Sequence, residues 1–159
     1  ATASVRCISL DESEKRNDRE ALWSGSVSIG GADLMIATEV AEALRNAHYL
    51  SENSRVILNT FILMPKQTRQ EMKINSLKYP SVEEVVAMLH QITPHVYVAN
   101  ASEMSMEYFG SYRMTNPLLV GMALSLGMLP FRKDTVKSLL QMDTKEALEL
   151  GFNSQAYFA

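Results

Sequence analysis

Cysteine is nearly absent from this sequence, and that scarcity limits the chemistry that the chain can support. Of 159 residues only Cys7 is a cysteine, and it lies within an apolar run. A single thiol cannot build a disulfide framework within the chain, and it cannot supply the set of thiolates that holds a zinc ion or an iron–sulfur cluster. Low cysteine content is typical of a reducing compartment, so we expect a cytoplasmic protein.

The glycine-rich and catalytic motifs of common enzymes are missing as well. No G-x-G-x-x-G, G-x-x-x-x-G-K-[ST] or G-x-S-x-G pattern occurs, which removes the usual phosphate-binding turns and the nucleophile elbow. The histidines at 48, 90 and 95 have neither H-x-x-x-H nor H-E-x-x-H spacing, so we expect no metal site. Glutamates of the predicted helices stand at cap or outward positions, and the sequence therefore nominates no catalytic residue.

Long apolar segments and an excess of positive charge are also lacking. The longest charge-free apolar stretch, residues 116–131, is shorter than the roughly 20 residues that a membrane helix needs. A net charge of −3 and a pI near 5.6 argue against binding to nucleic acid, which favours a basic surface. With 47% apolar residues, the chain has the composition and length of one globular domain over residues 1–159.

Apolar strands alternate along the chain with amphipathic helices. Because the strands at 32–38 and 55–59 are continuously apolar, we expect them to be covered on both faces, as in a parallel sheet. The fold class predicted is α/β, a three-layer α/β/α arrangement with a mostly parallel central sheet. Further strands are predicted at 4–9, 23–30 and 95–100, helices at 39–50, 79–92, 101–110, 116–129, 133–142 and 143–158, a charged loop at 10–20 and irregular chain at 60–80.

Particular residues predict where helices begin and end. Ser81 and Glu84 have capping-box spacing, and Gly110 is expected to end the helix before it. Asn116 is a natural N-cap with Pro117 in the first turn, and Asp143 is expected to open the last helix. The helix that follows Asn116 is apolar all round, so it should be covered on most sides.

Polar residues at the end of one predicted strand mark a candidate site. The strand at 55–59 delivers Asn59 and Thr60 to its C-terminal tip, which is where open α/β sheets tend to hold ligands. The same residues also suit ordinary strand-end turns, and this alternative stays open. A cluster of methionine and aromatic residues from Met104 to Met114 is equally consistent with core filling and with an interface.

Three segments, residues 31–60, 79–124 and 153–158, together resemble a known family. The chain is similar to the small subunit of thiamine-diphosphate-dependent 2-oxoacid:ferredoxin oxidoreductases, called gamma or beta, and most similar to the indolepyruvate type. The resemblance matches Glu39, Asn59, Thr60 and Asn116 to residues that face a ligand or a partner, although each also suits a structural role at a helix or strand end. Arg16 is the one match in a loop that otherwise departs from the family pattern.

The family's opening strand and glycine-rich turn have no counterpart here, so we expect a chain truncated or divergent at its N-terminus. A phosphate-binding role is therefore not carried over from the family. If one strand neighbour is lost, the exposed edge would favour pairing with another chain, including a homo-oligomer.

The resemblance implies a non-catalytic subunit that packs beside the active site of a larger subunit. Thiamine diphosphate and iron–sulfur clusters would be bound by partner subunits and none by this chain, ferredoxin would be met only indirectly, and coenzyme A binding stays open. The alternative is a stand-alone α/β binding module for a small anionic or nucleotide-like ligand, and a third is an enzyme with its own active site.

Overall fold

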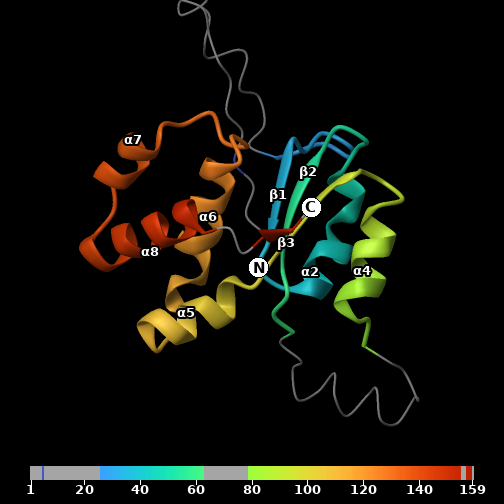
Figure 1. Ribbon diagram of the computed structural model, residues 1–159. Coiled ribbons are helices and arrows are strands. Elements are labelled where there is room, and N and C mark those ends of the chain that lie inside the picture. The colour runs from blue at the N-terminus through green and yellow to red at the C-terminus, as the bar shows by residue number, and fades with distance from the viewer. Residues whose placement is uncertain (1–4, 6–25, 63–78, 155–156, 159) are drawn as a thin grey trace, which may run out of the picture.

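The structure is a computed structural model, and it describes residues 5, 26–62, 79–154 and 157–158 (Figure 1). Strands, α-helices and two 3-10 turns (η) alternate along the described chain. In order they are β1 (Leu34–Ala37), α2 (Val40–Arg45), η1 (Ala47–Tyr49), β2 (Arg55–Asn59), α4 (Val82–Leu89), β3 (His95–Ala99), α5 (Ala101–Phe109), η2 (Tyr112–Met114), α6 (Thr115–Ser125), α7 (Lys133–Ser138), α8 (Met142–Asn153) and β4 (Tyr157–Phe158).

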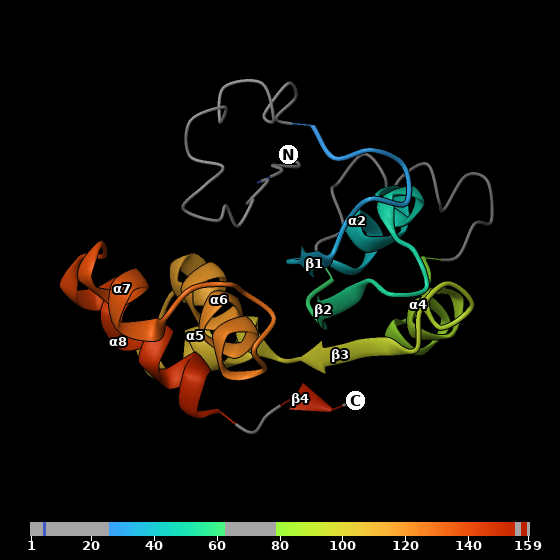
Figure 2. The same ribbon diagram turned by 90° about the horizontal axis from the view of Figure 1, so that it is seen from above.

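The described sheet has the order β1-β2-β3-β4. β1, β2 and β3 are parallel, with Met35 opposite Val56 and Val56 opposite Val96, whereas β4 runs antiparallel to β3. Figure 2 shows α2 and α4 on one side of the sheet and the helices from α5 to α8 on the other. The three-layer α/β/α class with a mostly parallel sheet is thereby confirmed.

The side chains of β2 divide between two hydrophobic cores, which explains why this strand is apolar at successive positions. Val56 and Leu58 point into the core beneath α2 and α4, where they meet Val85. Ile57 points the other way, into the core that contains Leu118 of α6. All five side chains are fully buried, and each such burial contributes about 1.5–3 kcal/mol to folding.

Helix α6 is apolar on every side because it lies between the sheet and α8 (Figures 1 and 2). Gly121 of α6 and Gly151 of α8 stand at the crossing of these two helices. A Cβ at Gly121 would lie 2.8 Å from the Phe152 amide nitrogen, and one at Gly151 would lie 2.8 Å from the Leu118 Cα. The two glycines therefore allow the helix backbones to touch, and the prediction that this helix is covered on most sides is confirmed.

Local signals in the sequence fix the ends of two helices as predicted. The Ser81 Oγ accepts a hydrogen bond from the Glu84 amide at 3.2 Å, and the Ser81 amide donates to Glu84 Oε2 at 2.8 Å. This reciprocal pair is a capping box. Helix α5 ends at Gly110, whose φ of 63° is the left-handed conformation that favours glycine at a helix C-terminus.

The prediction of a strand at 23–30 is wrong over the described residues 26–30. This segment is irregular and ends in a turn at Gly30, whose φ is 69° and whose amide donates to the His48 carbonyl at 3.1 Å. Ile29, expected to face a core, is 81% exposed. The alternation of apolar and polar residues failed here because no strand of the described chain lies beside the segment to accept it. The predicted strand at 4–9, the charged loop at 10–20, Arg16 and most of the irregular segment at 60–80 lie outside the described residues.

The prediction that the strand at 32–38 is covered on both faces is confirmed in part by the described chain. There β1 pairs with β2 alone, and of its four side chains only Ala37 is buried. Leu34 and Ile36 are nevertheless partly covered by the α6 core and Met35 by the α2 core. A continuous apolar run thus marks a strand between two layers, and it does not fix whether the strand is central.

The end of the chain differs from the predicted single helix over 143–158. Helix α8 starts at Met142 and stops at Asn153, and Tyr157–Phe158 form β4 against Val98 and Ala99 of β3. Asp143 does not cap α8, because the N-cap position is Gln141. Backbone groups at the edge of β3 pair with Tyr157 and Phe158. Helical periodicity within the segment cannot reveal such a pairing with a distant strand.

Across the described residues, no helix is both apolar enough and long enough to cross a bilayer.

Candidate functional site

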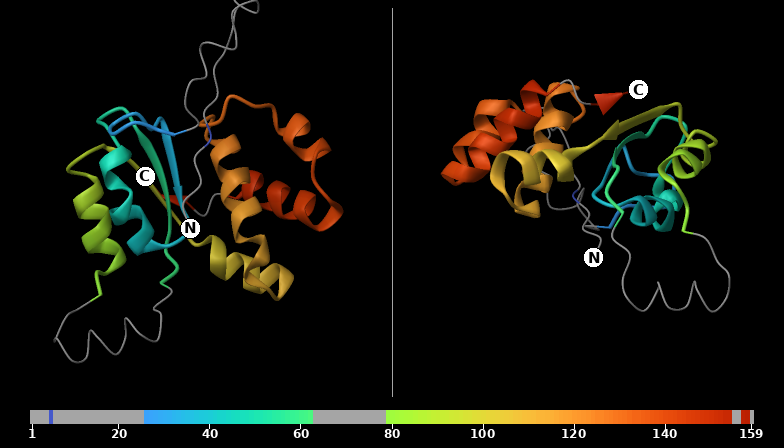
Figure 3. Two further views of the ribbon diagram at one scale, coloured as in Figure 1. Left: turned by 180° about the vertical axis from the view of Figure 1, so that it is seen from behind. Right: turned by 60° about the horizontal axis from the view of Figure 1, so that its bottom comes forward.

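The three parallel strands end at the same side of the molecule, and the segments that follow them form one rim. We call this the carboxyl rim, and it comprises residues 38–43, 59–62, 79–85 and 100–116. Helices α2 and α5 begin there directly after β1 and β3, and α4 begins there near Tyr79. Figure 3 shows α5 at this end of the molecule, beside the strands.

Asn59, at the tip of β2, is completely buried and fully hydrogen-bonded. Its Nδ2 donates to the Thr38 carbonyl at 2.9 Å and to the Ser102 Oγ at 2.8 Å. Its Oδ1 accepts from the Ser102 amide at 3.3 Å. The amide therefore joins the end of β1 to the start of α5, and no donor or acceptor is directed outward to a ligand.

The hydroxyls beside Asn59 extend this network to α6. Ser102 Oγ lies 3.4 Å from Thr115 Oγ1, in the first turn of α6, and both residues are buried. Thr60, which directly follows β2, is half-buried and forms a pair of its own, donating from Oγ1 to Asn100 Oδ1 at 3.2 Å. The network thus fixes the ends of two strands and the starts of two helices relative to one another.

Glu39 lies at the same rim but is engaged by a tyrosine. The Tyr79 hydroxyl donates to Glu39 Oε1. Burial, and after it the hydrogen bond to Glu39, together raise the pKa of Tyr79 to about 12. Glu39 occupies the N-cap position of α2 without capping it through its side chain. Its role in the structure is to hold the segment that carries Tyr79 against the start of α2.

Asn116 is exposed, and the prediction that it is an N-cap is wrong. Helix α6 begins one residue earlier, with Met114 at the N-cap position, because η2 runs directly into it. Pro117 does fall in the first turn, where its missing amide hydrogen is not needed. Of the residues matched by resemblance, Asn59 belongs to the buried network, Thr60 and Glu39 each belong to a separate pair, and Asn116 is exposed.

The sequence reading missed the partners that complete these contacts. Ser102, Thr115, Asn100 and Tyr79 each bond to a residue between 13 and 43 positions away along the chain. The sequence offered one indication of these partners, a small polar residue directly after a strand-to-helix junction, as at Asn100 and Ser102. That pattern does not say which residue across the rim the side chain bonds to.

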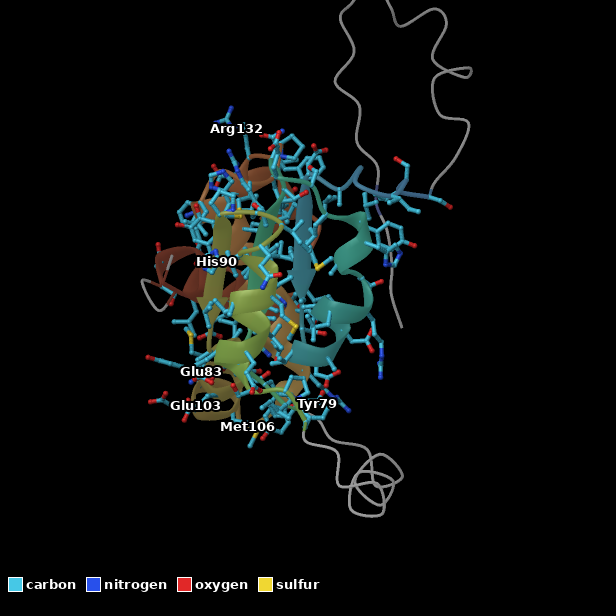
Figure 4. The ribbon with its side chains drawn as sticks, turned by 90° about the vertical axis from the view of Figure 1, so that its right-hand side faces the viewer. Tyr79, Glu83, His90, Glu103, Met106 and Arg132 are labelled. Atoms are coloured by element: carbon cyan, nitrogen blue, oxygen red, sulfur yellow. The ribbon has the colours of Figure 1, made fainter. Side chains whose placement is uncertain are left out.

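Over its described residues the carboxyl rim carries mostly negative charge, although Arg45, just beyond it on α2, pairs with Glu42. Its four segments contain six carboxylates, Glu39, Glu42, Glu83, Glu84, Glu103 and Glu107, and one basic residue, Arg113. Elsewhere in the described chain six acidic residues are balanced by six basic ones. Figure 4 shows Glu83 and Glu103 with Tyr79 and Met106 at the end of the molecule opposite Arg132. The first turns of α2, α4 and α5 carry their own glutamates, which occupy the positions where helix dipoles favour anions.

Metal ligands do not gather in the described part of the chain. No group of three His, Asp, Glu or Cys side chains placed to hold an ion is found there. The described histidines are separate and exposed: His48 lies in η1 against Tyr49, His90 caps the C-terminus of α4, and His95 begins β3. The chemistry that the rim offers is hydrogen bonding and negative charge.

Comparisons with known proteins agree with the resemblance. The profile of the family described as pyruvate ferredoxin/flavodoxin oxidoreductase matches residues 13–156. The chain is 39% identical over 132 residues to indolepyruvate oxidoreductase subunit IorB of Archaeoglobus fulgidus, which covers 78% of this chain and 63% of that protein. Subunits of the same name are 29% identical over 112 residues in Methanothermobacter thermautotrophicus and 25% identical over 121 residues in Pyrococcus horikoshii.

The matched regions cover 70% and 76% of this chain for the second and third relatives, and 55% and 58% of those proteins. The chain therefore spans between 55% and 63% of the length of these curated relatives. Because the family profile covers nearly all of the sequence, the chain belongs to the pyruvate ferredoxin/flavodoxin oxidoreductase family.

Proposed function

We propose that this chain is a non-catalytic subunit of a thiamine-diphosphate-dependent 2-oxoacid:ferredoxin oxidoreductase of the indolepyruvate type. It packs beside the active site of a larger subunit, and the complex works in the cytoplasm. The observation that carries the proposal is the 39% identity to a protein named as an indolepyruvate oxidoreductase subunit, extending over 78% of the chain.

The geometry of the carboxyl rim supports a structural role over a catalytic one. Catalysis needs a polar group that is free to meet a substrate. Asn59, Ser102 and Thr115 are instead buried and bonded to one another, and Thr60 bonds to Asn100. A network of this kind holds the shape of a surface on which another chain can be positioned.

The residues present do not fit the cofactors of such an enzyme. An iron–sulfur cluster is usually held by four thiolates, and the chain has one cysteine. The diphosphate of thiamine needs positive charge or free backbone donors, whereas the described segments of the rim have six carboxylates to one guanidinium. We therefore assign both cofactors to partner subunits, and no reaction step is assigned to this chain.

The same charge weighs against the alternative of a stand-alone module for anionic or nucleotide-like ligands. Phosphates are bound at helix N-termini when those termini are open to them. In α2, α4 and α5 the first turn holds a glutamate, which would repel a phosphate. Coenzyme A carries phosphates too, so we expect it to be held, if at all, by groups of the larger subunit.

Co-expression tests the proposal directly. Three preparations are compared: the chain alone, the chain together with the thiamine-binding subunit encoded in the same genome, and that subunit alone. Indolepyruvate oxidation is measured with an artificial electron acceptor. We expect activity and a brown colour to copurify with the pair, and the isolated chain to be colourless and inactive. Activity of the isolated chain, or full activity of the larger subunit with no complex formed, would refute the proposal.

A further inference from the structure

An apolar patch lies within the acidic carboxyl rim, beside the end of β2. The rings of Phe61 and Tyr112 pack at a tilt of 44° with centroids 5.1 Å apart, which joins the chain after β2 to η2. Ile62 and Tyr112 are 42% and 53% exposed. These side chains are large, and roughly half of the surface of each is exposed.

Met106 of α5 adds a further exposed apolar side chain at the same end of the molecule (Figure 4). Ser102 faces the Asn59 amide at the end of β2, and Met106, four residues later, lies on the same side of the helix. Its side chain is 40% exposed. Ser105 Oγ donates to the Ser111 carbonyl at 2.5 Å and so holds η2, which carries Tyr112, against α5. We call Phe61, Ile62, Met106 and Tyr112 the rim patch.

Composition and charge together specify what would cover such a surface. Tyrosine, phenylalanine and methionine are enriched in the centres of protein interfaces, which have a polar rim around them. Glu83, Glu103 and Glu107 are exposed on α4 and α5 at the same end of the molecule, as Figure 4 shows for the first two. An apolar centre bordered by carboxylates is complementary to an apolar surface bordered by lysine and arginine.

We propose that the rim patch is the docking surface for the larger subunit, whose contact surface is basic around an apolar centre. The inference rests on the proposed function, because it names the face of this chain that meets that partner. A second copy of the chain is disfavoured, since a twofold contact through the rim would place glutamates of one copy against those of the other. Nucleic acid is disfavoured by the same negative charge.

The test uses the full chain and the larger subunit, with affinity and association rate measured by biolayer interferometry. Two double variants probe the patch and its border: Met106→Ala with Tyr112→Ala, and Glu83→Gln with Glu107→Gln. Matched controls are Leu139→Ala, which truncates an apolar side chain that is 82% exposed just after α7, and Glu146→Gln on α8. Thermal melts followed by circular dichroism establish that every variant is folded.

We expect the apolar double variant to raise the dissociation constant about tenfold or more, as loss of central aromatic anchors does. The acidic double variant should slow association several-fold at low salt and reduce the dependence of the association rate on salt. Both controls should stay within about twofold of wild type. These results together would support the docking surface.

Three outcomes would overturn it. Wild-type affinity in both rim variants would place the interface elsewhere, while leaving the proposed function intact. Rim variants that abolish self-association in sedimentation experiments, with unchanged binding to the larger subunit, would assign the patch to a second copy. Absence of any complex between the wild-type chains would refute the proposed function and this inference with it.

Discussion

A methyl group added at the crossing of α6 and α8 tests the packing described above. Gly121→Ala and Gly151→Ala are informative because alanine is the better helix former and by itself would stabilise a helix by about 1 kcal/mol. At Gly151 the added Cβ would stand 2.8 Å from both the Cα and the carbonyl carbon of Leu118. Carbon atoms in contact prefer about 3.5–4.0 Å, so the helices must separate by roughly 1 Å.

The obstacle is backbone, which cannot rotate away as a side chain can. Overpacking of this kind costs about 1–3 kcal/mol or more, and the propensity gain offsets about 1 kcal/mol of it. Because the clash is with backbone, we expect the cost at the upper end of this range, about 3 kcal/mol. After the offset, each single variant should lower the free energy of unfolding by about 2 kcal/mol, or the melting temperature by about 4–8 °C. The double variant should cost less than the sum of both, because one separation of the helices accommodates both methyl groups.

Urea denaturation followed by circular dichroism measures these differences. Gly110→Ala is the matched control: its Cβ would meet nothing within 4 Å, and only its φ of 63° opposes alanine. We expect that control to cost about 1 kcal/mol. A Gly121→Ala or Gly151→Ala protein as stable as wild type, or more so, would refute the close approach of the two helices.

Three further predictions concern stability and ionisation. Asn59→Ala should lower the free energy of unfolding by about 3 kcal/mol in urea titrations, because it leaves buried partners of the amide unsatisfied. Because the pKa of Tyr79 is raised above its usual 10 to about 12, stability should fall as pH rises from 10 to 12, and less so in Tyr79→Phe. The hydrogen bond from Lys137 lowers the pKa of Glu149 below its usual 4.5, so the small stability it contributes should be lost as pH falls below 4.5, and Lys137→Met should remove that dependence.

Each of these has a result that would contradict it. Asn116→Ala is the control for Asn59→Ala, since Asn116 is exposed. If both variants have the same free energy of unfolding, the hydrogen bonds of Asn59 do not stabilise the rim. For Tyr79, absorbance at 295 nm is titrated against pH in wild type and in Tyr79→Phe. If the difference between the two shows ionisation near pH 10, the raised pKa of Tyr79 is contradicted. For Glu149, identical acid limbs of the denaturation profile in wild type and Lys137→Met would show that the ion pair contributes nothing.

Local sequence patterns predicted those elements whose ends are determined by nearby residues. The capping box at Ser81 and Glu84 and the left-handed Gly110 depend on neighbours within a few positions, and both were confirmed. The buried strand β2 was predicted because both of its faces are covered, so every position from Val56 to Leu58 must be apolar. These features needed no knowledge of the rest of the fold.

Elements that depend on distant partners were predicted wrongly or not at all. β4 exists because the edge of β3 accepts it, and nothing within the segment at 153–158 distinguishes it from a helix end. Contrary to the prediction, Asn116 is not the N-cap of α6, because η2 continues directly into that helix and Met114 takes the N-cap position. In the candidate site, Asn59 and Thr60 were found because parallel strands end together, whereas Ser102 and Thr115 become visible only when α5 and α6 are placed beside them.

The late position of β4 has a consequence for how the protein is made. The outer edge of β3 at Val98 and Ala99 is paired by residues 157 and 158, almost sixty positions further along the chain. While a ribosome is still synthesising α6 and α8, that edge has no β4 to cover it, and an open edge next to an apolar core favours association between nascent chains. Rapid translation of this final stretch, or a chaperone that holds the growing chain, would shorten or shield the interval in which neighbouring copies can join edge to edge.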